Sequence, residues 1–206
     1  CRKLTFWRAA SLVVLAGCVL VVGLLFADDK GRAAFTDHIA RVRIDGLITG
    51  DARTLELLAE IKKDAHVKAV ILRIDSPGGT VGDSQEIHSS LLRLREKGCR
   101  VVASFGNISA SGGVYIGVAA EKIIAKPGTI TGSIGVILRG NNLSRLLERI
   151  GVQFETVKSG LYKDILSPDR ALTGDERELL QGLIDSSYGQ FVAAVAEGRG
   201  LEEEQV

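Results

Sequence analysis

The sequence predicts an α/β domain with a largely parallel sheet, preceded by one transmembrane helix. From residue 38 onward, short apolar runs typical of strands alternate with amphipathic runs typical of helices. The run 67–74 is almost unbroken in its apolar residues, as in a strand covered on both faces. Residues 9–27 carry no charge, and at about 1.5 Å rise per residue a helix of this length nearly spans a hydrocarbon core of roughly 30 Å.

The charges around residues 9–27 predict an orientation in the membrane. Basic residues such as Arg2 and Arg8 precede this segment, and Asp28 and Asp29 follow it. Because basic residues favour the cytoplasmic side, we expect the N-terminus inside and the following domain outside. A cleavable signal peptide is the alternative, but its apolar core is normally about 7–15 residues long, which favours an uncleaved anchor.

The rest of the chain divides into a cytoplasmic tail, a linker and one domain, which we place at residues 1–8, 28–38 and 39–206. The net charge is +1 and aromatic residues make up 5%, so there is no basic, aromatic stripe for nucleic acid. The sequence contains no methionine and stops in the charged run 202–206. We therefore expect a piece of a longer protein whose C-terminal part is missing.

Within the domain, residue spacing and turn residues predict each element in order. Apolar residues at helical spacing predict the amphipathic helices, Gly98 and Gly151 end two of them, and β-branched runs bounded by glycine predict the strands. The strands are expected at 38–49, 67–74, 100–105 and 153–158, with short apolar runs at 122–125 and 131–137. The helices are expected at 51–64, 81–97, 114–120, 142–150 and 174–198.

Two strand-to-helix turns, residues 75–80 and 107–113, are predicted at the same edge of the sheet. Parallel strands bring their carboxyl ends together, and ligands of α/β proteins bind at that edge. Ser111 lies among small residues at the start of a helix and is a candidate nucleophile. The backbone N–H groups of Gly78 and Gly112 are candidate donors to an oxyanion. Taken singly, each sequence is also consistent with a plain tight turn.

A serine nucleophile needs a base, and the sequence offers histidine or lysine. His38, His66 and His88 all lie outside the glycine-rich turns, so a Ser-His-Asp triad has little support. A desolvated lysine is neutral more easily and then accepts the serine proton. Lys163 is the best candidate because it lies in a Ser-Gly-x-x-Lys-Asp loop, although such a lysine is more often simply solvated. A hydrogen bond from Ser133 would orient the amine.

Four motifs occur in a fixed order along the domain. They are Asp-Ser-Pro-Gly-Gly at 75–79, Ala-Ser-Gly-Gly at 110–113, Thr-Gly-Ser-Ile-Gly-Val at 131–136, and the run from Lys158 through Lys163-Asp164 to Ser167-Pro168. This series resembles the short bacterial form of the signal peptide peptidase A family, which are membrane-anchored serine/lysine proteases. The similarity runs from about Val42 to Val206.

The resemblance implies a Clp protease/crotonase-like fold with repeated strand-strand-helix units. It places the nucleophile at Ser111, the general base at Lys163 and the serine that positions this lysine at Ser133. It places the oxyanion donors at the N–H groups of Gly78 and Gly112. No metal or organic cofactor is implied.

The resemblance also implies a location and partners. Family members form dome-shaped homo-oligomers on the extracytoplasmic face of the bacterial inner membrane, where they degrade cleaved signal peptides. In the short form, neighbouring protomers contribute the serine and the lysine of each site. The expected partners are therefore apolar peptide substrates, the lipid bilayer and further copies of the chain, without nucleic acid.

Three other functions remain open from the sequence. A related protease of the same family would act on other membrane proteins or on phage capsid precursors. A crotonase-like acyl-CoA enzyme would share the fold and the oxyanion hole but would not need Ser111 or Lys163. A non-catalytic membrane scaffold would retain the site without using it.

Overall fold

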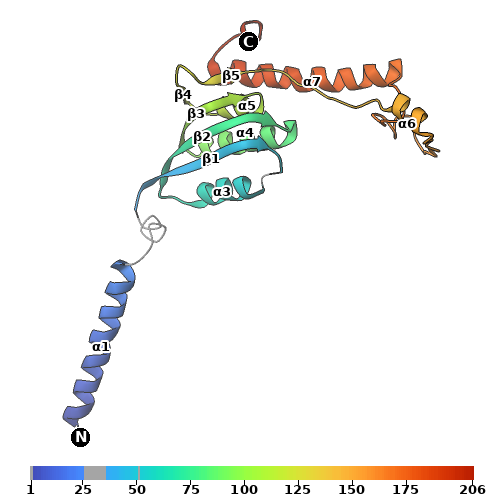
Figure 1. The fold of residues 1–206 in the computed structure, drawn as a ribbon. Coiled ribbons are helices and arrows are strands. Elements are labelled where there is room, and N and C mark those ends of the chain that lie inside the picture. The colour runs from blue at the N-terminus through green and yellow to red at the C-terminus, as the bar shows by residue number, and fades with distance from the viewer. Residues whose placement is uncertain (1, 26–35, 51) are drawn as a thin grey trace.

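The computed structural model describes residues 2–25, 36–50 and 52–206, and its centre is a parallel β-sheet with helices packed against it (Figure 1). The order of elements alternates strands and helices through the first half of the domain. The elements of the described residues are α1 (Arg2–Leu25), β1 (His38–Ile48), α3 (Ala52–Lys63), β2 (Val67–Gly79), α4 (Val81–Glu96), β3 (Arg100–Ala110), α5 (Gly112–Gly117), β4 (Lys122–Ile124), β5 (Ile130–Gly132), α6 (Ser144–Ile150), α7 (Gly174–Arg199) and η1 (Glu203–Gln205).

The sheet has five strands in the order β1-β2-β3-β4, and β5 pairs with β3 farther along that strand. All four pairings are parallel. Each pair of adjacent parallel strands needs a crossover connection, which α3 and α4 supply between β1, β2 and β3. Single strands therefore alternate with single helices here, which differs from the expected repeat of two strands and a helix. The α/β class itself is confirmed.

The main core covers one face of the sheet. In β2, Val70, Leu72 and Ile74 are fully buried, whereas Ile71 between them is 40% exposed. Successive side chains of a strand point to opposite faces, so the prediction that both faces of this run are covered is wrong for the described residues. The buried face packs against apolar side chains of all three neighbouring helices: Leu58 of α3, Leu91 of α4 and Ile116 of α5.

A second, smaller core attaches the C-terminal part of α7 to α5. Phe191 and Val195 of α7 are buried against Val114 of α5 and Val118, the residue that follows α5. Gly198 approaches so closely that an added Cβ would lie 2.4 Å from the backbone oxygen of Val118. This end of α7 is thus fixed to the body that carries Ser111.

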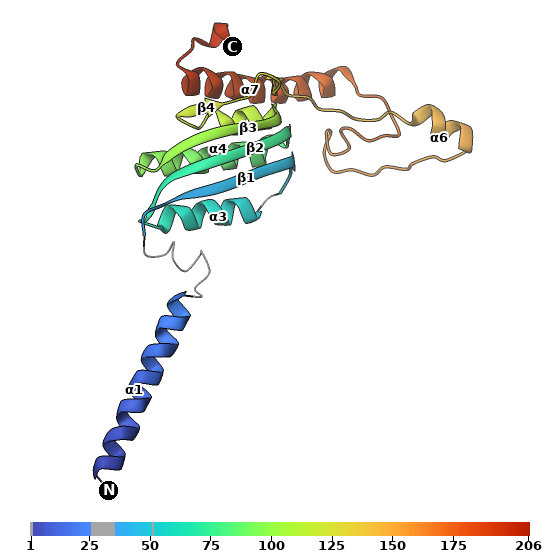
Figure 2. The same cartoon turned by 60° about the vertical axis from the view of Figure 1, so that its left-hand side comes forward.

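The N-terminal half of α7 continues beyond the sheet and meets the arm, a name we use for residues 137–173. Figures 1 and 2 both show the arm, with α6 at its tip, standing away from the sheet. Residues 153–158, predicted as a strand, form no strand in the arm. Phe154 and Val157 are exposed there. The run has strand-like residues but pairs with no strand in the described chain, and a strand needs such a partner.

The predicted membrane anchor at residues 9–27 coincides with α1 as far as Leu25, and Phe26 and Ala27 lie outside the described residues. The predicted linker 28–38 also falls largely outside them. In the part of the chain that the structure describes, none of the helices combines the length and the apolar character needed to cross a membrane.

Candidate active site

Ser111 stands at the junction between β3 and α5 in a strained backbone conformation. Its φ is 50° and its ψ is −120°, a combination that residues other than glycine rarely adopt. The backbone N–H of Ser111 donates to the carbonyl of Gly132 at 2.9 Å, which holds the turn against β5. The hydroxyl does not cap the helix that follows. The turn therefore presents a half-buried serine side chain that is not used for helix capping.

Gly78 brings the end of β2 against this turn. Its φ is +105°, and an added Cβ would lie 2.8 Å from the Cβ of Ser111 and 2.9 Å from the N of Gly112. Its backbone N–H donates to the hydroxyl of Ser76 at 3.1 Å. The N–H of Gly78, a predicted oxyanion donor, therefore has a hydroxyl partner in this structure.

Gly79, one residue later, is the glycine that faces the pocket beside Ser111. The N–H of Thr80 donates to the carbonyl of Ile48 in β1, so by the alternation along a strand the N–H of Gly79 points to the other side. The N atom of Gly79 lies 3.3 Å from where a Cβ on Gly112 would be. Gly112 is the first residue of α5, where the N–H has no partner within the helix. Gly79 and Gly112 both line the pocket beside Ser111, so their N–H groups are candidate donors there.

The pocket at Ser111 is small, with a volume of about 30 Å³. Hydroxyl and apolar side chains of α4, α5, α7 and the residues just before α4 and α5 surround it, together with the backbone of Gly79 in β2 and residues that follow β5. Tyr115 contacts the ring of Phe191 edge-on, with ring centroids 5.0 Å apart, which closes one side. The lining residues are Gly79, Thr80, Val81, Ser84, Ser111, Gly112, Tyr115, Gly135, Val136, Ser187 and Phe191.

Asp75 supports the strand that leads to Ser111. Its Oδ1 accepts hydrogen bonds from the N–H groups of Asn107 at 3.2 Å and Ile108 at 3.1 Å. The carboxylate also fills the space beside Gly106, where an added Cβ would lie 2.4 Å from the Asp75 Cγ. The register between β2 and β3 shifts at this point, so the carboxylate replaces ladder bonds that the shift removes.

We expect Asp75→Ala to destabilise the domain by about 2 kcal/mol, because two N–H groups lose a charged acceptor. Peptide cleavage should fall as well, since the segment between the lost bonds and Ser111 is short. Urea unfolding and an activity assay check this, with the exposed Asp185→Ala as control. Unchanged stability in Asp75→Ala would contradict the role given to these bonds.

The structure brings Ser133, but not Lys163, to the neighbourhood of Ser111. Ser133 directly follows Gly132, the residue whose carbonyl accepts the N–H of Ser111, and it has a φ of 56°. Lys163 lies on an exposed loop of the arm and does not line the pocket. The predicted pair of Ser111 and Lys163 is therefore not assembled within this single chain.

The histidines do not take the place of Lys163. His38 and His66 stand at the starts of β1 and β2, the sheet edge opposite Ser111, and face Asp64 and Asp37. His88 packs edge-on against Tyr115, and burial lowers the pKa of its imidazole. Among the described residues, no three His, Cys, Asp or Glu side chains group as metal ligands.

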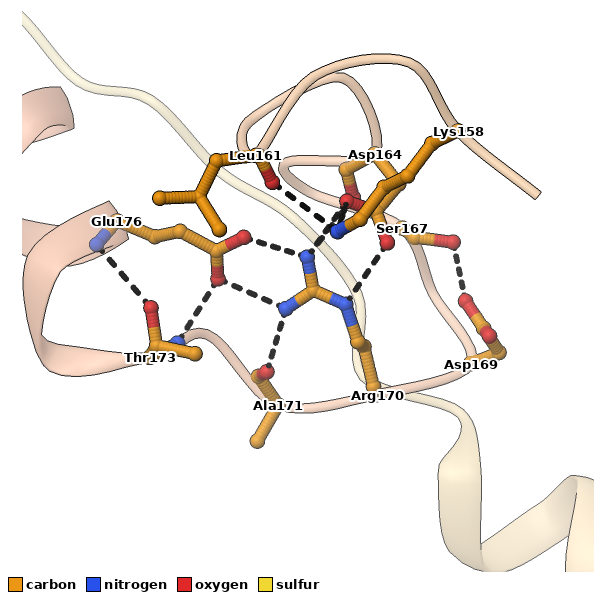
Figure 3. Close-up of polar contacts among 9 residues, drawn as sticks. All are labelled: Lys158, Leu161, Asp164, Ser167, Asp169, Arg170, Ala171, Thr173 and Glu176. Atoms are coloured by element: carbon orange, nitrogen blue, oxygen red, sulfur yellow. Dashed lines mark hydrogen bonds and ion pairs between the residues drawn. The ribbon is translucent and has the colours of Figure 1, made fainter. Parts of the chain in front are cut away.

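The sequence did not predict one polar cluster, which joins the arm to the first turn of α7 (Figure 3). Arg170 donates to both carboxylate oxygens of Glu176, at 2.7 and 2.5 Å, and to Asp164 at 3.2 Å. The Nζ of Lys158 lies 2.5 Å from the Oδ1 of Asp164. Arg170 is six residues from Asp164 and six from Glu176, which matches no helical or strand spacing. The only signal for this cluster in the sequence was that basic and acidic residues stand next to each other there.

These ion pairs lower the pKa values of both carboxyl groups. Hydrogen bonds from Arg170, and then from Lys158, hold the pKa of Asp164 well below its usual range. Arg170 and the backbone of Thr173 lower the pKa of Glu176 from 4.5 to about 2. Because the folded values lie below the unfolded ones, the stabilisation from Glu176 is complete above about pH 4.5 and is lost as the pH falls toward 2.

Comparison with known proteins identifies the family. Residues 93–206 match the model of peptidase family S49. A Synechocystis protein assigned as a protease is 59% identical over 169 residues, which cover 82% of this chain and 61% of the relative. An Enterococcus faecium protein assigned as the signal peptide peptidase SppA is 40% identical over 188 residues, covering 85% of this chain and 55% of the relative. The chain belongs to peptidase family S49.

The chain thus spans somewhat more than half the length of these relatives. Among solved structures, ClpP1 from Listeria monocytogenes superimposes with a TM-score of 0.46 and 18% identity. That alignment covers 80% of this chain and 75% of the other.

Proposed function

We propose that this chain carries the catalytic site of a serine endopeptidase that cleaves peptides with Ser111 as nucleophile. The observation that carries the proposal is the conformation of Ser111. A strained serine stands at the start of a helix, its hydroxyl caps no N–H of that helix, and a small pocket opens beside it. Strain of this kind persists only where the surrounding structure imposes it, and it concentrates at active sites. Membership of a peptidase family supports the same conclusion.

In the proposed reaction, the Oγ of Ser111 attacks the peptide carbonyl carbon and the neutral amine of Lys163 accepts its proton. The N–H groups of Gly112 and Gly79 stabilise the oxyanion that forms. The amine then passes the proton to the leaving nitrogen, which releases one peptide and leaves an acyl-enzyme. A water molecule, activated by the same amine, releases the second peptide. Ser133 would orient the lysine.

Because the arm holds Lys163 away from the pocket, we propose that Ser111 and Lys163 of neighbouring copies form each site in a homo-oligomer. The apolar wall of the pocket favours apolar peptides, and cleaved signal peptides are the proposed natural substrates. Attachment through residues 9–27, and a place on the outer side of a bacterial inner membrane, stay predictions from the sequence.

The test is cleavage of a synthetic signal peptide by the full-length protein, followed by mass spectrometry. Wild type should cleave, whereas Ser111→Ala and Lys163→Ala should each lose about 10³-fold or more in kcat. A mixture of the two variants, co-assembled from unfolded chains, should regain activity, because roughly a quarter of sites join intact residues by random assembly.

Other results would point elsewhere. Normal cleavage by Lys163→Ala would refute the lysine mechanism. A wild-type protein that assembles but cuts nothing would favour the scaffold, whereas cleavage of intact membrane proteins alone would favour the related protease.

A further inference from the structure

The loop that carries Lys163 has little of its own to hold it in place. Its backbone makes turn bonds, such as the N–H of Lys163 to the carbonyl of Gly160 at 3.2 Å, and every residue from 151 to 163 is exposed. A general base must nevertheless stand within hydrogen-bond reach of its serine. Something outside the loop must therefore fix its position.

Two charged residues close this loop at its ends. The Nζ of Lys158, before the loop, contacts the Oδ1 of Asp164, which directly follows Lys163. The same amine donates to the carbonyl of Leu161 at 3.0 Å. Figure 3 shows both bonds reaching across the turn, so residues 159–163 are enclosed between these side chains.

Arg170 connects the closed loop to α7. Its guanidinium donates one hydrogen bond to the carboxylate of Asp164 on one side and two hydrogen bonds to the carboxylate of Glu176 on the other. Glu176 is only 3% exposed and belongs to the first turn of α7, where its carboxylate also accepts the N–H of Thr173 at 2.9 Å. Since the far end of α7 packs on α5, a continuous path links the loop to the body of the domain.

The backbone between Asp164 and Arg170 is itself strained. Leu166 has a φ of 67°, a left-handed conformation that costs a residue with a Cβ roughly 1–2 kcal/mol. The neighbouring Pro168 accepts the N–H of Leu143 at 2.7 Å, which ties this segment to the start of α6. The segment therefore keeps one defined shape.

We propose that Arg170 is a positioning residue that fixes the Lys163 loop to α7 by bridging Asp164 and Glu176. This proposal rests on the proposed function, in which Lys163 is the general base. Arg170 itself touches no substrate. The planar guanidinium suits this task, because it bonds two carboxylates at once, which the single ammonium of lysine does with poorer geometry.

The test compares Arg170→Ala, Arg170→Lys and Asp164→Asn with wild type in the signal-peptide assay. Arg170→Ala should lower kcat roughly 100-fold, as expected for a catalytic group displaced by about 1 Å, with KM changed less than about twofold. Arg170→Lys should recover part of the loss. Asp164→Asn leaves the pair of Arg170 and Glu176 intact, so it should lower kcat without unfolding α7.

The control is Arg177→Ala, an exposed arginine next to Glu176 that makes none of these ion pairs. It should cleave as wild type does. Equal losses of kcat in Arg177→Ala and Arg170→Ala would overturn the proposal, and so would normal kcat in both Arg170→Ala and Asp164→Asn.

Mixed assemblies show whether Arg170 acts through Lys163. If the site is shared between copies, Arg170→Ala mixed with Ser111→Ala should regain activity, because the Ser111→Ala copy supplies an intact lysine loop. Mixed with Lys163→Ala it should not. Recovery in the second mixture, or failure in the first while Lys163→Ala with Ser111→Ala recovers, would overturn the proposal.

A failure of the proposed function can be distinguished from a failure of the Arg170 proposal. If the proposed function is wrong, Ser111→Ala or Lys163→Ala itself cleaves normally. If instead both are inactive and their mixture also stays inactive, each chain forms its own site. The kcat and KM of Arg170→Ala and Asp164→Asn then decide the proposal alone.

Discussion

Ser111→Gly should abolish cleavage and at the same time make the protein more stable. Removal of the hydroxyl removes the nucleophile, and enzymes that lose such a residue fall by about 10⁶-fold in kcat. A residue with a Cβ in the conformation of Ser111 costs roughly 1–3 kcal/mol, and glycine adopts it freely. After the entropy that glycine loses on folding, a net gain of about 1 kcal/mol should remain, which thermal unfolding would show as a rise of roughly 2–4 °C.

Ser111→Ala separates the two effects. Alanine also lacks the hydroxyl, but its Cβ keeps the strain, so this variant should be inactive without becoming more stable. Residual cleavage at the wild-type rate in either variant would show that the nucleophile lies elsewhere. A Ser111→Gly protein that melts below Ser111→Ala would show that the turn is not strained.

The strand and helix pattern around Ser111 was predictable because it depends on local chemistry. Glycine pairs after apolar runs predicted both turns, and parallel strands with crossover helices place such turns at one edge. The structure confirms the alternation, although β2 and β3 extend farther than expected, to Gly79 and Ala110. Both strands continue into their turns, since each still has a neighbour to pair with there.

The sequence does not separate Gly78 from Gly79 as candidate oxyanion donors. The two glycines are adjacent in the same turn, and a shift of one residue along a strand reverses the side to which the backbone N–H points. Only the bond from Thr80 to Ile48 fixes that direction, and Ile48 is distant along the chain. The bond from the N–H of Gly78 to the hydroxyl of Ser76 likewise depends on how the backbone is oriented at the end of β2.

The structure of the arm could not be predicted from the sequence. Its apolar run at 153–158 looks like a strand, but a strand needs a neighbour that the described chain does not offer. Its charged residues look solvated one by one, yet Asp164, Arg170 and Glu176 form one cluster. Pairing of this kind depends on how loops fold back, which no periodic pattern in the sequence reports.

The second large effect is expected from Gly79→Ala, which should destabilise the domain by more than about 3 kcal/mol, beyond the usual cost of an overpacked core. An added Cβ would lie 1.9 Å from the carbonyl oxygen of Ile48 and 2.6 Å from its carbonyl carbon. These are backbone atoms of β1, which is paired along its length with β2 and cannot rotate aside. The end of β2 must shift instead, and the N–H of Gly79 would shift with it.

Gly82→Ala is the matched control, three residues later and in the first turn of α4. An added Cβ there meets nothing within 4 Å, and alanine in a helix is favoured over glycine by roughly 0.5–1 kcal/mol. Urea unfolding should therefore move the two midpoints in opposite directions. If Gly79→Ala unfolds at the same urea concentration as wild type, the close approach of β1 and β2 is wrong. A displaced end of β2 would no longer direct the N–H of Gly79 toward Ser111. If Gly79→Ala is unstable but its folded fraction still cleaves at the full rate, the N–H of Gly79 therefore does not hold the oxyanion.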